Sequence, residues 1–370
     1  MGTITRGIAN NILGSGAVDG TDGLSGTVPS NNIANASLDN ITSLPPSVDA
    51  GIPSVAGNPP SPSDGDVWYN TNTYKLRVRG ISAPGGSWAS GGNMNTARGC
   101  SGFGTQTAAI AAGGSGTPAS QTTESYNGST WTEVGDLNSP RNFGGHTNGL
   151  GTQSSGMVMG QDDPARSGKT ETWNGTSWTE TNDLNTIRRG MSAFGEDATA
   201  SLCFAGENPG TNMIVDTESW NGSSWTEVNN LNTGHYAAAG LGSTYTAGLC
   251  ATGRNLDASP NLTSIDNNES WNGTSWTEIG DVNTTRFDLA SAGSQAAGMI
   301  MGGGPSAIAN TEVWNGSTWT EIGDLSTARS SITGAGTQSL AVAMGGSTGT
   351  ASAATEEFTG SADNLDVTLS

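Results

Sequence analysis

Basic residues, histidine and cysteine are all scarce in this chain of 370 residues. It has 13 Lys plus Arg against 33 Asp plus Glu, a formal net charge of −20, two His and three Cys. A chain of this charge repels phosphate backbones, so a nucleic-acid partner is not expected. Two histidines leave little for a zinc site or a Ser-His relay, and three cysteines cannot complete a disulfide framework. We therefore expect no metal, no cofactor and no catalytic residue.

Long apolar runs and helix-forming patterns are lacking as well. No stretch approaches the roughly 18 apolar residues of a membrane span, and the first residues lack the apolar core of a secretory signal. We expect a chain that is soluble when made and does not insert into membranes. The 33% of hydrophobic residues and the 56 Gly exclude a helical bundle. They approach the composition of a disordered chain, and the regular placement of the 11 Trp is what indicates a fold.

The regular placement of tryptophan reflects an internal repeat. Five segments have the form Glu-x-aromatic-Asn-Gly-Ser/Thr-Ser/Thr-Trp and end at Trp131, Trp178, Trp225, Trp276 and Trp319. Trp88 opens the same row, and the successive spacings are 43, 47, 47, 51 and 43 residues. A period in the forties is typical of four-stranded propeller blades.

Each repeat can be divided into four strands. Asn-Gly between two aromatic-bearing runs predicts a hairpin with a type I′ turn. Before each hairpin lies a short run of small and apolar residues, which predicts a strand buried on both faces. These runs span residues 108–113, 157–160, 202–206, 247–253, 298–302 and 341–345. One further strand, such as residues 330–336, precedes each run, and four strands make a propeller blade.

The strand count predicts how the ring closes. The hairpin partner of the row Trp occurs six times, the last time as Phe358, whereas no row Trp follows Phe358. The first row Trp, Trp88, precedes the first complete unit. We therefore predict an all-β, six-bladed propeller in which an N-terminal strand around Trp88 completes the C-terminal blade.

The repeat resembles the kelch family over about three quarters of the chain. The order of Arg, apolar run, Gly-Gly, Glu-x-aromatic, Trp and Leu-Asn-Thr-x-Arg carries the resemblance. Double glycine occurs as Gly113-Gly114, Gly302-Gly303 and Gly345-Gly346, and the remaining units depart as Gly160-Gln161, Gly206-Glu207 and Gly253-Arg254. The hairpin also resembles the Asp-box of sialidases, with Asn for Asp and one residue fewer before Trp.

The N-terminal region has a different character from the repeats. Residues 1–60 lack any strand or helix period and predict an extended attachment arm. Residues 61–86 predict a hairpin around Asn70–Asn72 and a linker, residues 87–361 the propeller, and residues 362–370 a tail. The stretch from Gly65 to Val78 is similar to segments of bacteriophage tail-fibre-like proteins. An arm followed by near-identical kelch-like units resembles virion proteins of marine phages.

A row of basic residues is the candidate ligand-binding site. Ten residues after each row Trp lie Arg98, Arg141, Arg188, His235, Arg286 and Arg329. The equivalent spacing predicts that all six lie around one mouth of the ring. One interpretation is a cationic mouth for an acidic sugar or carboxylate, as the resemblance to peptide-binding kelch domains implies. The other is a structural ion pair with the acid five residues earlier, at Asp136, Asp183, Asp281 and Asp324.

The remaining candidates are interpreted as scaffold. Ten Glu recur in the units, five of them seven residues before a row Trp and five two residues after it, and repetition argues against a catalytic pair. The five Asn-Gly-Ser/Thr sequons are explained by turns. Residues 161–163 do not match a calcium loop. Cys100, Cys203 and Cys250 are interpreted as buried small side chains.

These interpretations favour a phage virion protein that is not an enzyme. We predict a tail-fibre- or spike-like structural protein whose propeller contacts the host surface or neighbouring virion proteins. Its partners would be other virion proteins through residues 1–60, a host glycan or receptor, and a second copy of the chain. A capsid or tail decoration protein is the alternative, and a sialidase-like glycan hydrolase is a third. The longest loops, residues 206–213 and 254–268, are the expected receptor contacts.

Overall fold

The computed structural model describes residues 54–56, 67–72, 75–78, 85–115, 120–142, 149–161, 165–210, 213–256 and 262–360. The predicted arm (1–60, apart from 54–56) and the predicted tail (362–370) lie outside these residues. The chain divides into two units, residues 1–85 with 362–370 and residues 86–361. All described elements are β-strands, and within the described residues no helix is long and apolar enough to cross a membrane.

The first unit contains a small sheet. Strands β2 (Val67–Asn70) and β3 (Lys75–Val78) form an antiparallel hairpin, in which Trp68 lies opposite Arg77. Strand β1 (Ser54–Val55) adds to β2 in parallel. The predicted hairpin around residues 70–72 is therefore present, and Trp68 is fully buried.

The second unit contains six antiparallel sheets of four strands each. Blade 1 is β5 (Ser101–Thr105), β6 (Ala108–Gly114), β7 (Ser120–Tyr126) and β8 (Trp131–Glu133). Blade 2 is β9 (Gly149–Thr152), β10 (Ser155–Gln161), β11 (Ser167–Trp173) and β12 (Trp178–Thr181). Blade 3 is β13 (Ser192–Asp197), β14 (Ala200–Phe204), β15 (Thr217–Trp220) and β16 (Trp225–Val228). Blade 4 is β17 (Ala239–Thr244), β18 (Ala247–Leu256), β19 (Leu262–Trp271) and β20 (Trp276–Ile279). Blade 5 is β21 (Ala290–Gly293), β22 (Gly298–Met301), β23 (Thr311–Trp314) and β24 (Trp319–Glu321). Blade 6 is β25 (Thr333–Gly336), β26 (Leu340–Met344), β27 (Thr355–Gly360) and β4 (Gly86–Ser90).

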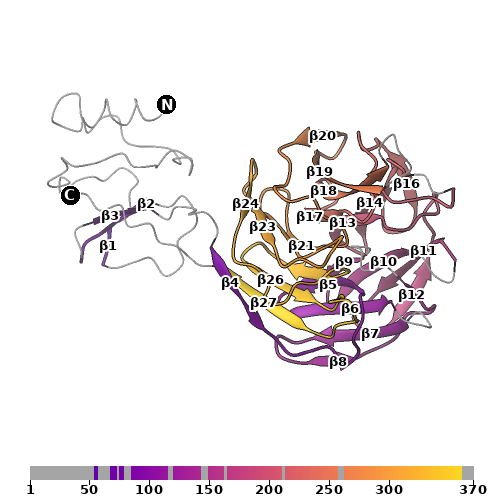
Figure 1. Cartoon of the computed structure of the whole chain (residues 1–370), viewed down its shortest axis with the longest axis horizontal. Coiled ribbons are helices and arrows are strands. Elements are labelled where there is room, and N and C mark those ends of the chain that lie inside the picture. Colours follow the sequence, from indigo (N-terminus) through magenta and orange to yellow (C-terminus); the bar gives the residue numbers. More distant parts are fainter. Residues whose placement is uncertain are drawn as a thin grey trace. The chain divides into compact units, whose positions relative to one another are not determined.

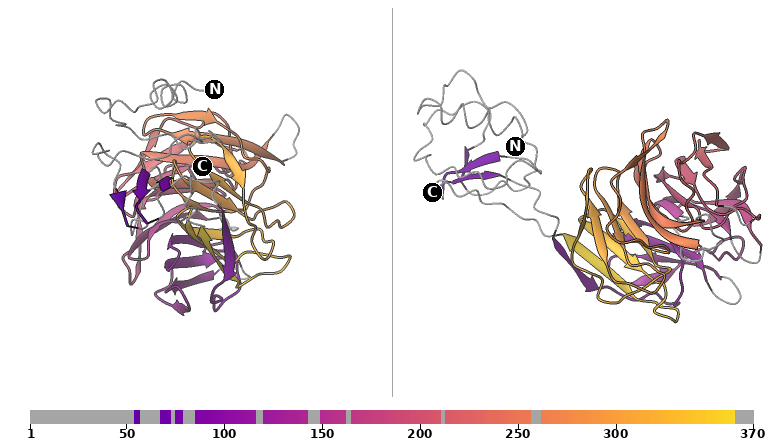
Figure 2. Two further views of the ribbon diagram at one scale, coloured as in Figure 1. Left: turned by 90° about the vertical axis from the view of Figure 1, so that its left-hand side faces the viewer. Right: turned by 45° about the horizontal axis from the view of Figure 1, so that its top comes forward.

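The sixth blade closes the ring with a strand from the other end of the unit. Strand β4 is antiparallel to β27, with Trp88 opposite Phe358. Figure 1 shows indigo β4 alongside yellow β27, and Figure 2 shows the blades from two further sides. The first strands of the blades contact each other in one closed ring around the axis. The prediction of a six-bladed propeller closed by an N-terminal strand is confirmed.

Neighbouring blades are joined by the row tryptophans. The indole Nε1 of Trp178 donates a hydrogen bond to Thr123 Oγ1 of the preceding blade at 3.0 Å. The same bond, to a Thr of the third strand, recurs from Trp88, Trp131, Trp225 and Trp276. In blade 4 this Thr is replaced by Asn268, and the facing Trp319 Nε1 and Asn268 Oδ1 are both buried without a hydrogen-bond partner.

The Asn-Gly turns differ from the prediction. Tyr126 pairs with Trp131, so the loop between them has four residues, and the same register recurs at Trp173 and Trp178. Gly128 has φ +88°, whereas Asn127 does not lie in the left-handed region. The prediction of a type I′ turn is therefore wrong. The Oδ1 of Asn127 instead accepts backbone hydrogen bonds from Ser129 and Thr130 and stabilises the longer loop.

The double-glycine position has a conformational cause. Its first residue has a positive φ in every blade, between 54° and 66°, and is a glycine in four of them. The exceptions are Ala205 (φ 63°) and Thr252 (φ 54°), each followed by a glycine. In blades 3 and 4 the double-glycine position is therefore Ala205-Gly206 and Thr252-Gly253, one residue earlier than the pairs predicted from the sequence. The residue that departs from glycine is the first of each pair. The Thr252 hydroxyl contacts the carbonyl oxygens of Ile265 and Arg286, both at 2.7 Å.

Candidate functional site

The basic row occupies one equivalent place in all six blades. Each residue lies in the connection that leads from the outermost strand of one blade to the innermost strand of the next. The side chains of Arg98, Arg141, Arg188, His235, Arg286 and Arg329 are all fully buried, with 0% of their surface exposed. None of the six therefore presents its charge to solvent in this structure.

Each row residue faces a glutamate on the third strand of its own blade. Arg188 Nη2 lies 2.6 Å from Glu218 Oε1, and its Nη1 donates to the carbonyl oxygens of Ala205 and Asp216. The equivalent pairs are Arg98–Glu124, Arg141–Glu171, Arg286–Glu312 and Arg329–Glu356, and His235 faces Glu269. Buried charges are stable only when paired and hydrogen-bonded, and both conditions hold for the five arginines, whereas His235 Nε2 has no hydrogen-bond partner.

The acid partner predicted from the sequence was wrong. The aspartates five residues before the row make no ion pair with it in the described part of the chain. Asp136 and Asp324 instead accept backbone N–H bonds from Thr123 and Thr311, both at 3.2 Å. Asn230 makes the same bond to Thr217, since an amide oxygen accepts as well as a carboxylate does. The change from Asp to Asn is thus unrelated to the change from Arg to His.

Two parts of this network were missed in the sequence. The first is Glu356, the sixth member of the inner Glu row, which lies two residues before Phe358 as the others lie before their aromatic residues. The second is an asparagine three residues before the row residue. Asn185, for example, donates to Glu218 Oε2 through both its backbone N (2.7 Å) and its Nδ2 (2.9 Å). The Leu-Asn dipeptide of the repeat is the sequence signal from which this asparagine could have been predicted.

Blade 4 contains the one departure from arginine. His235 Nδ1 lies 2.8 Å from the carbonyl oxygen of Thr252, which can only accept, so Nδ1 carries a proton. Nε2 lies 3.6 Å from Glu269 Oε1. Burial lowers the pKa of His235, but Cys250, Glu269 and the Thr252 carbonyl raise it, and the resulting pKa is raised to about 10. The raised pKa favours the protonated ring, whose Nε2 then faces Glu269 as arginine faces glutamate in the other blades, but without a hydrogen bond.

The other repeated groups fit a scaffold as well. The second Glu row lies on the outermost strands and is exposed, at Glu133, Glu180, Glu227, Glu278 and Glu321. The three cysteines are buried and free. Burial raises the pKa of Cys100 to about 11 and that of Cys203 to about 12, so both thiols remain protonated and unreactive at neutral pH. No group of metal-ligating side chains occurs among the residues that the structure describes.

The mouth beside the row is asymmetric, which the repeat did not reveal. In five blades the residue after the row residue accepts a backbone hydrogen bond from the segment that follows the double-glycine position, which is a loop in blades 1, 3, 5 and 6 and the end of β18 in blade 4. These pairs are Gly99–Ser115, Arg189–Glu207, Tyr236–Arg254, Phe287–Gly304 and Ser330–Ser347. Blades 1 and 6 thus carry only small side chains at this place, whereas blades 3, 4 and 5 carry aromatic and charged ones.

Arginine and aromatic residues alternate along the large half of the mouth. Arg189 Cζ lies 5.6 Å from the centre of the Tyr236 ring, and Arg254 Cζ lies 3.3 Å from the centre of the Phe287 ring. Each arginine thus contacts an aromatic residue of the next blade. We call Arg189, Tyr236, Arg254 and Phe287 the aromatic–arginine arc.

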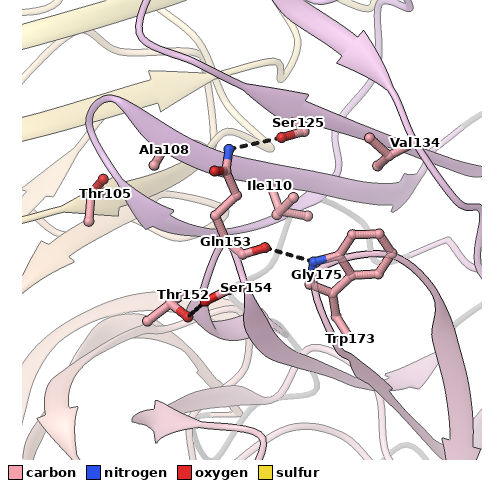
Figure 3. Close-up of a pocket in the computed structure, with 10 residues that line it drawn as sticks. All are labelled: Thr105, Ala108, Ile110, Ser125, Val134, Thr152, Gln153, Ser154, Trp173 and Gly175. Atoms are coloured by element: carbon pink, nitrogen blue, oxygen red, sulfur yellow. Dashed lines mark hydrogen bonds between the residues drawn. The ribbon is translucent and has the colours of Figure 1, made fainter.

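A groove lies between blades 1 and 2, at the opposite ends of the strands. Its volume is about 420 Å³, and its lining contains no charged residue. Figure 3 shows Gln153 between the two blades. Its side-chain Nε2 donates to Ser125 Oγ of blade 1 at 2.8 Å, and its backbone carbonyl oxygen accepts from Trp173 Nε1 of blade 2 at 2.8 Å. Equivalent glutamines at positions 106, 295 and 338 also donate to a neighbouring blade. The Gln153 bond at this groove is therefore one of a series of hydrogen bonds between blades.

The loops predicted to contact a receptor are only partly described. Of the predicted loops 206–213 and 254–268, residues 211–212 and 257–261 lie outside the described chain. Residues 254–256 and 262–268 belong to strands β18 and β19, so the prediction of a loop is wrong for these residues. Ligand binding by the basic row stays a prediction. The burial and pairing of these six residues favour the structural interpretation of them.

The fold and the mouth define a six-bladed β-propeller with one asymmetric face. No family model and no curated protein matches the chain. Among solved structures, one titled "Structure of YjhT" is similar with a TM-score of 0.57 and 13% sequence identity. The match covers 72% of this chain and 95% of that one, and at this identity it shows the fold alone.

Proposed function

We propose that this chain is a structural protein of a bacteriophage virion, similar to a tail fibre or spike, and that its propeller is a binding module. The observation that carries the proposal is the junction of two unlike parts. The hairpin β2–β3 belongs to the segment that resembles tail-fibre-like proteins, and β4, which completes the ring, follows only eight positions after β3 ends at Val78. A rigid closed ring is thereby joined to a segment suited to attachment.

Binding rather than catalysis is proposed for the propeller. The inner Glu row is committed to buried ion pairs, so these carboxylates are not available as an acid–base pair. The aromatic–arginine arc lies on one side of the mouth, as a binding surface for a single partner requires. A glycan hydrolase similar to sialidases remains the third candidate.

The location of the protein in the particle is the direct test. An antibody against the propeller, used for gold labelling of purified phage particles, is expected to mark the tail tip. Mass spectrometry of the same particles counts the copies in each. Tens of copies would support a fibre or spike, and hundreds spread over the capsid or tail tube would support the decoration protein. Absence from purified particles would refute both.

A further inference from the structure

One positive side chain in the propeller lacks an acidic partner. Within the described residues of the propeller, Arg254 has neither an ion pair nor a side-chain hydrogen bond. Seven other arginines and Lys169 all have a carboxylate within 4.0 Å: Arg98, Arg141, Arg166, Arg188, Arg189, Arg286 and Arg329. In a chain of net charge −20, with acids in large excess, an unpaired guanidinium is a marked exception.

Arg254 is also held in place. Its guanidinium lies 3.3 Å from the centre of the Phe287 ring, which is only 4% exposed. Its backbone exchanges two hydrogen bonds with Tyr236, at 2.9 and 2.8 Å. A guanidinium stacked on a ring keeps its N–H donors in one plane, so little conformational entropy is lost when it binds an anion.

The surroundings indicate what kind of anion fits. Arg166 and Arg189 each lie within 4.0 Å of Glu207, so these two neighbouring arginines are already paired with an acid. A ligand with several charges per sugar, such as a heavily sulfated glycan, would be repelled more strongly by the rest of the chain than one with a single charge per sugar. The planar N–H donors match the two oxygens of a carboxylate.

We propose that Arg254, with Tyr236 and Phe287, forms a binding site for a carboxylated saccharide, such as a uronic-acid residue of a polysaccharide. The guanidinium binds the carboxylate, and the half-buried Tyr236 ring contacts the sugar. This inference deepens the proposed function, because it names the chemistry of the surface that a virion protein would contact.

The test measures binding of the purified full-length protein to three polymers: polygalacturonate, neutral dextran and dextran sulfate. We expect salt-sensitive binding to polygalacturonate and none to dextran. Arg254→Ala should weaken binding about tenfold or more, the usual effect of losing a hydrogen bond to a charged group. Arg254→Lys should weaken it nearly as much, because lysine keeps the charge but loses the planar fork.

Lys169→Ala is the matched control. It removes one positive charge from a residue that is paired with Glu180 and should change affinity less than twofold. Melting temperatures of all variants check folding. Binding by Arg254→Ala equal to that of the unaltered protein would overturn the site, and so would absence of binding to polygalacturonate. Arg254-dependent binding that is tighter for dextran sulfate would overturn the carboxylate assignment. The assay uses no phage particle, so its failure is separate from failure of the virion role.

Discussion

Trp88 lies opposite Phe358 in the closing blade, and their ring centres are 5.2 Å apart although they stand at the two ends of the propeller sequence. Trp88 Nε1 also donates to Thr311 Oγ1 of blade 5 at 3.2 Å. One residue thereby joins the N-terminal strand to two blades.

This relationship predicts the effect of truncation. Deleting residues 1–95 removes β4 and leaves the edge of β27 unpaired, so the melting temperature should fall sharply. Deleting residues 1–60 leaves every strand of the propeller in place and should not change it. Trp88→Ala should lower the free energy of unfolding by about 3–5 kcal/mol, as loss of a buried Trp does. Equal thermal stability of the two truncations would contradict closure by β4.

The charge of His235 predicts a pH dependence confined to blade 4. Its pKa is raised to about 10 in the folded chain, against an ordinary value near 6.5. The stabilisation is therefore complete below about pH 6.5 and is lost as the pH rises through about 10. Thermal melts between pH 6 and pH 10 should show falling stability. His235→Arg, which restores the residue of the other blades, should flatten this dependence, and an equally steep profile in this variant would argue against His235 as the cause.

The unpartnered atoms between blades 4 and 5 predict a stabilising substitution. Asn268→Thr places the hydroxyl found in the other five blades opposite Trp319 Nε1, which has no partner now. It gives up the Asn268 bond to the Gly280 carbonyl oxygen, and the net gain should be about 1 kcal/mol. Chemical denaturation measures it, and a less stable variant would show that Asn268 fits this blade better than threonine does.

Backbone strain at Ala205 predicts a second stabilising substitution. A non-glycine residue at φ 63° costs about 1–2 kcal/mol, and glycine occupies this position in four blades. Ala205→Gly should therefore raise the melting temperature. The matched change Thr252→Gly also removes the hydroxyl contacts to Ile265 and Arg286 and should not stabilise. Stabilisation of similar size by both substitutions would show that the Thr252 hydroxyl contributes nothing.

Much of the fold could be predicted because the repeat carries it. The Tyr126–Trp131 pair and its equivalents mark the outer hairpin of each blade, and Phe358 without a following Trp marks the missing strand. The turn within the hairpin could not be predicted, because the same Asn-Gly dipeptide serves two-residue and four-residue loops. Only the pairing register, with four residues between Tyr126 and Trp131, distinguishes them.

The charged network was harder to predict than the fold. Arg188 has Asp183 five residues away in sequence, but its partner is Glu218, thirty residues away on another strand. Sequence distance favours the wrong acid because a blade folds the third strand against the entry loop. The mouth was missed for a related reason: Arg254 and Phe287 meet across two blades, so no single repeat contains the contact.

The central claim is that the repeated charges build the scaffold, and the Arg188–Glu218 pair tests it most directly. The measurement is the free energy of unfolding of Arg188→Ala, Glu218→Ala and the double variant. Each single change leaves one buried charge unpaired and should cost about 3–5 kcal/mol. The double variant removes both charges, so it should be destabilised by clearly less than the sum of the single variants. Single variants that are as stable as the unaltered protein, or costs that simply add, would contradict the account.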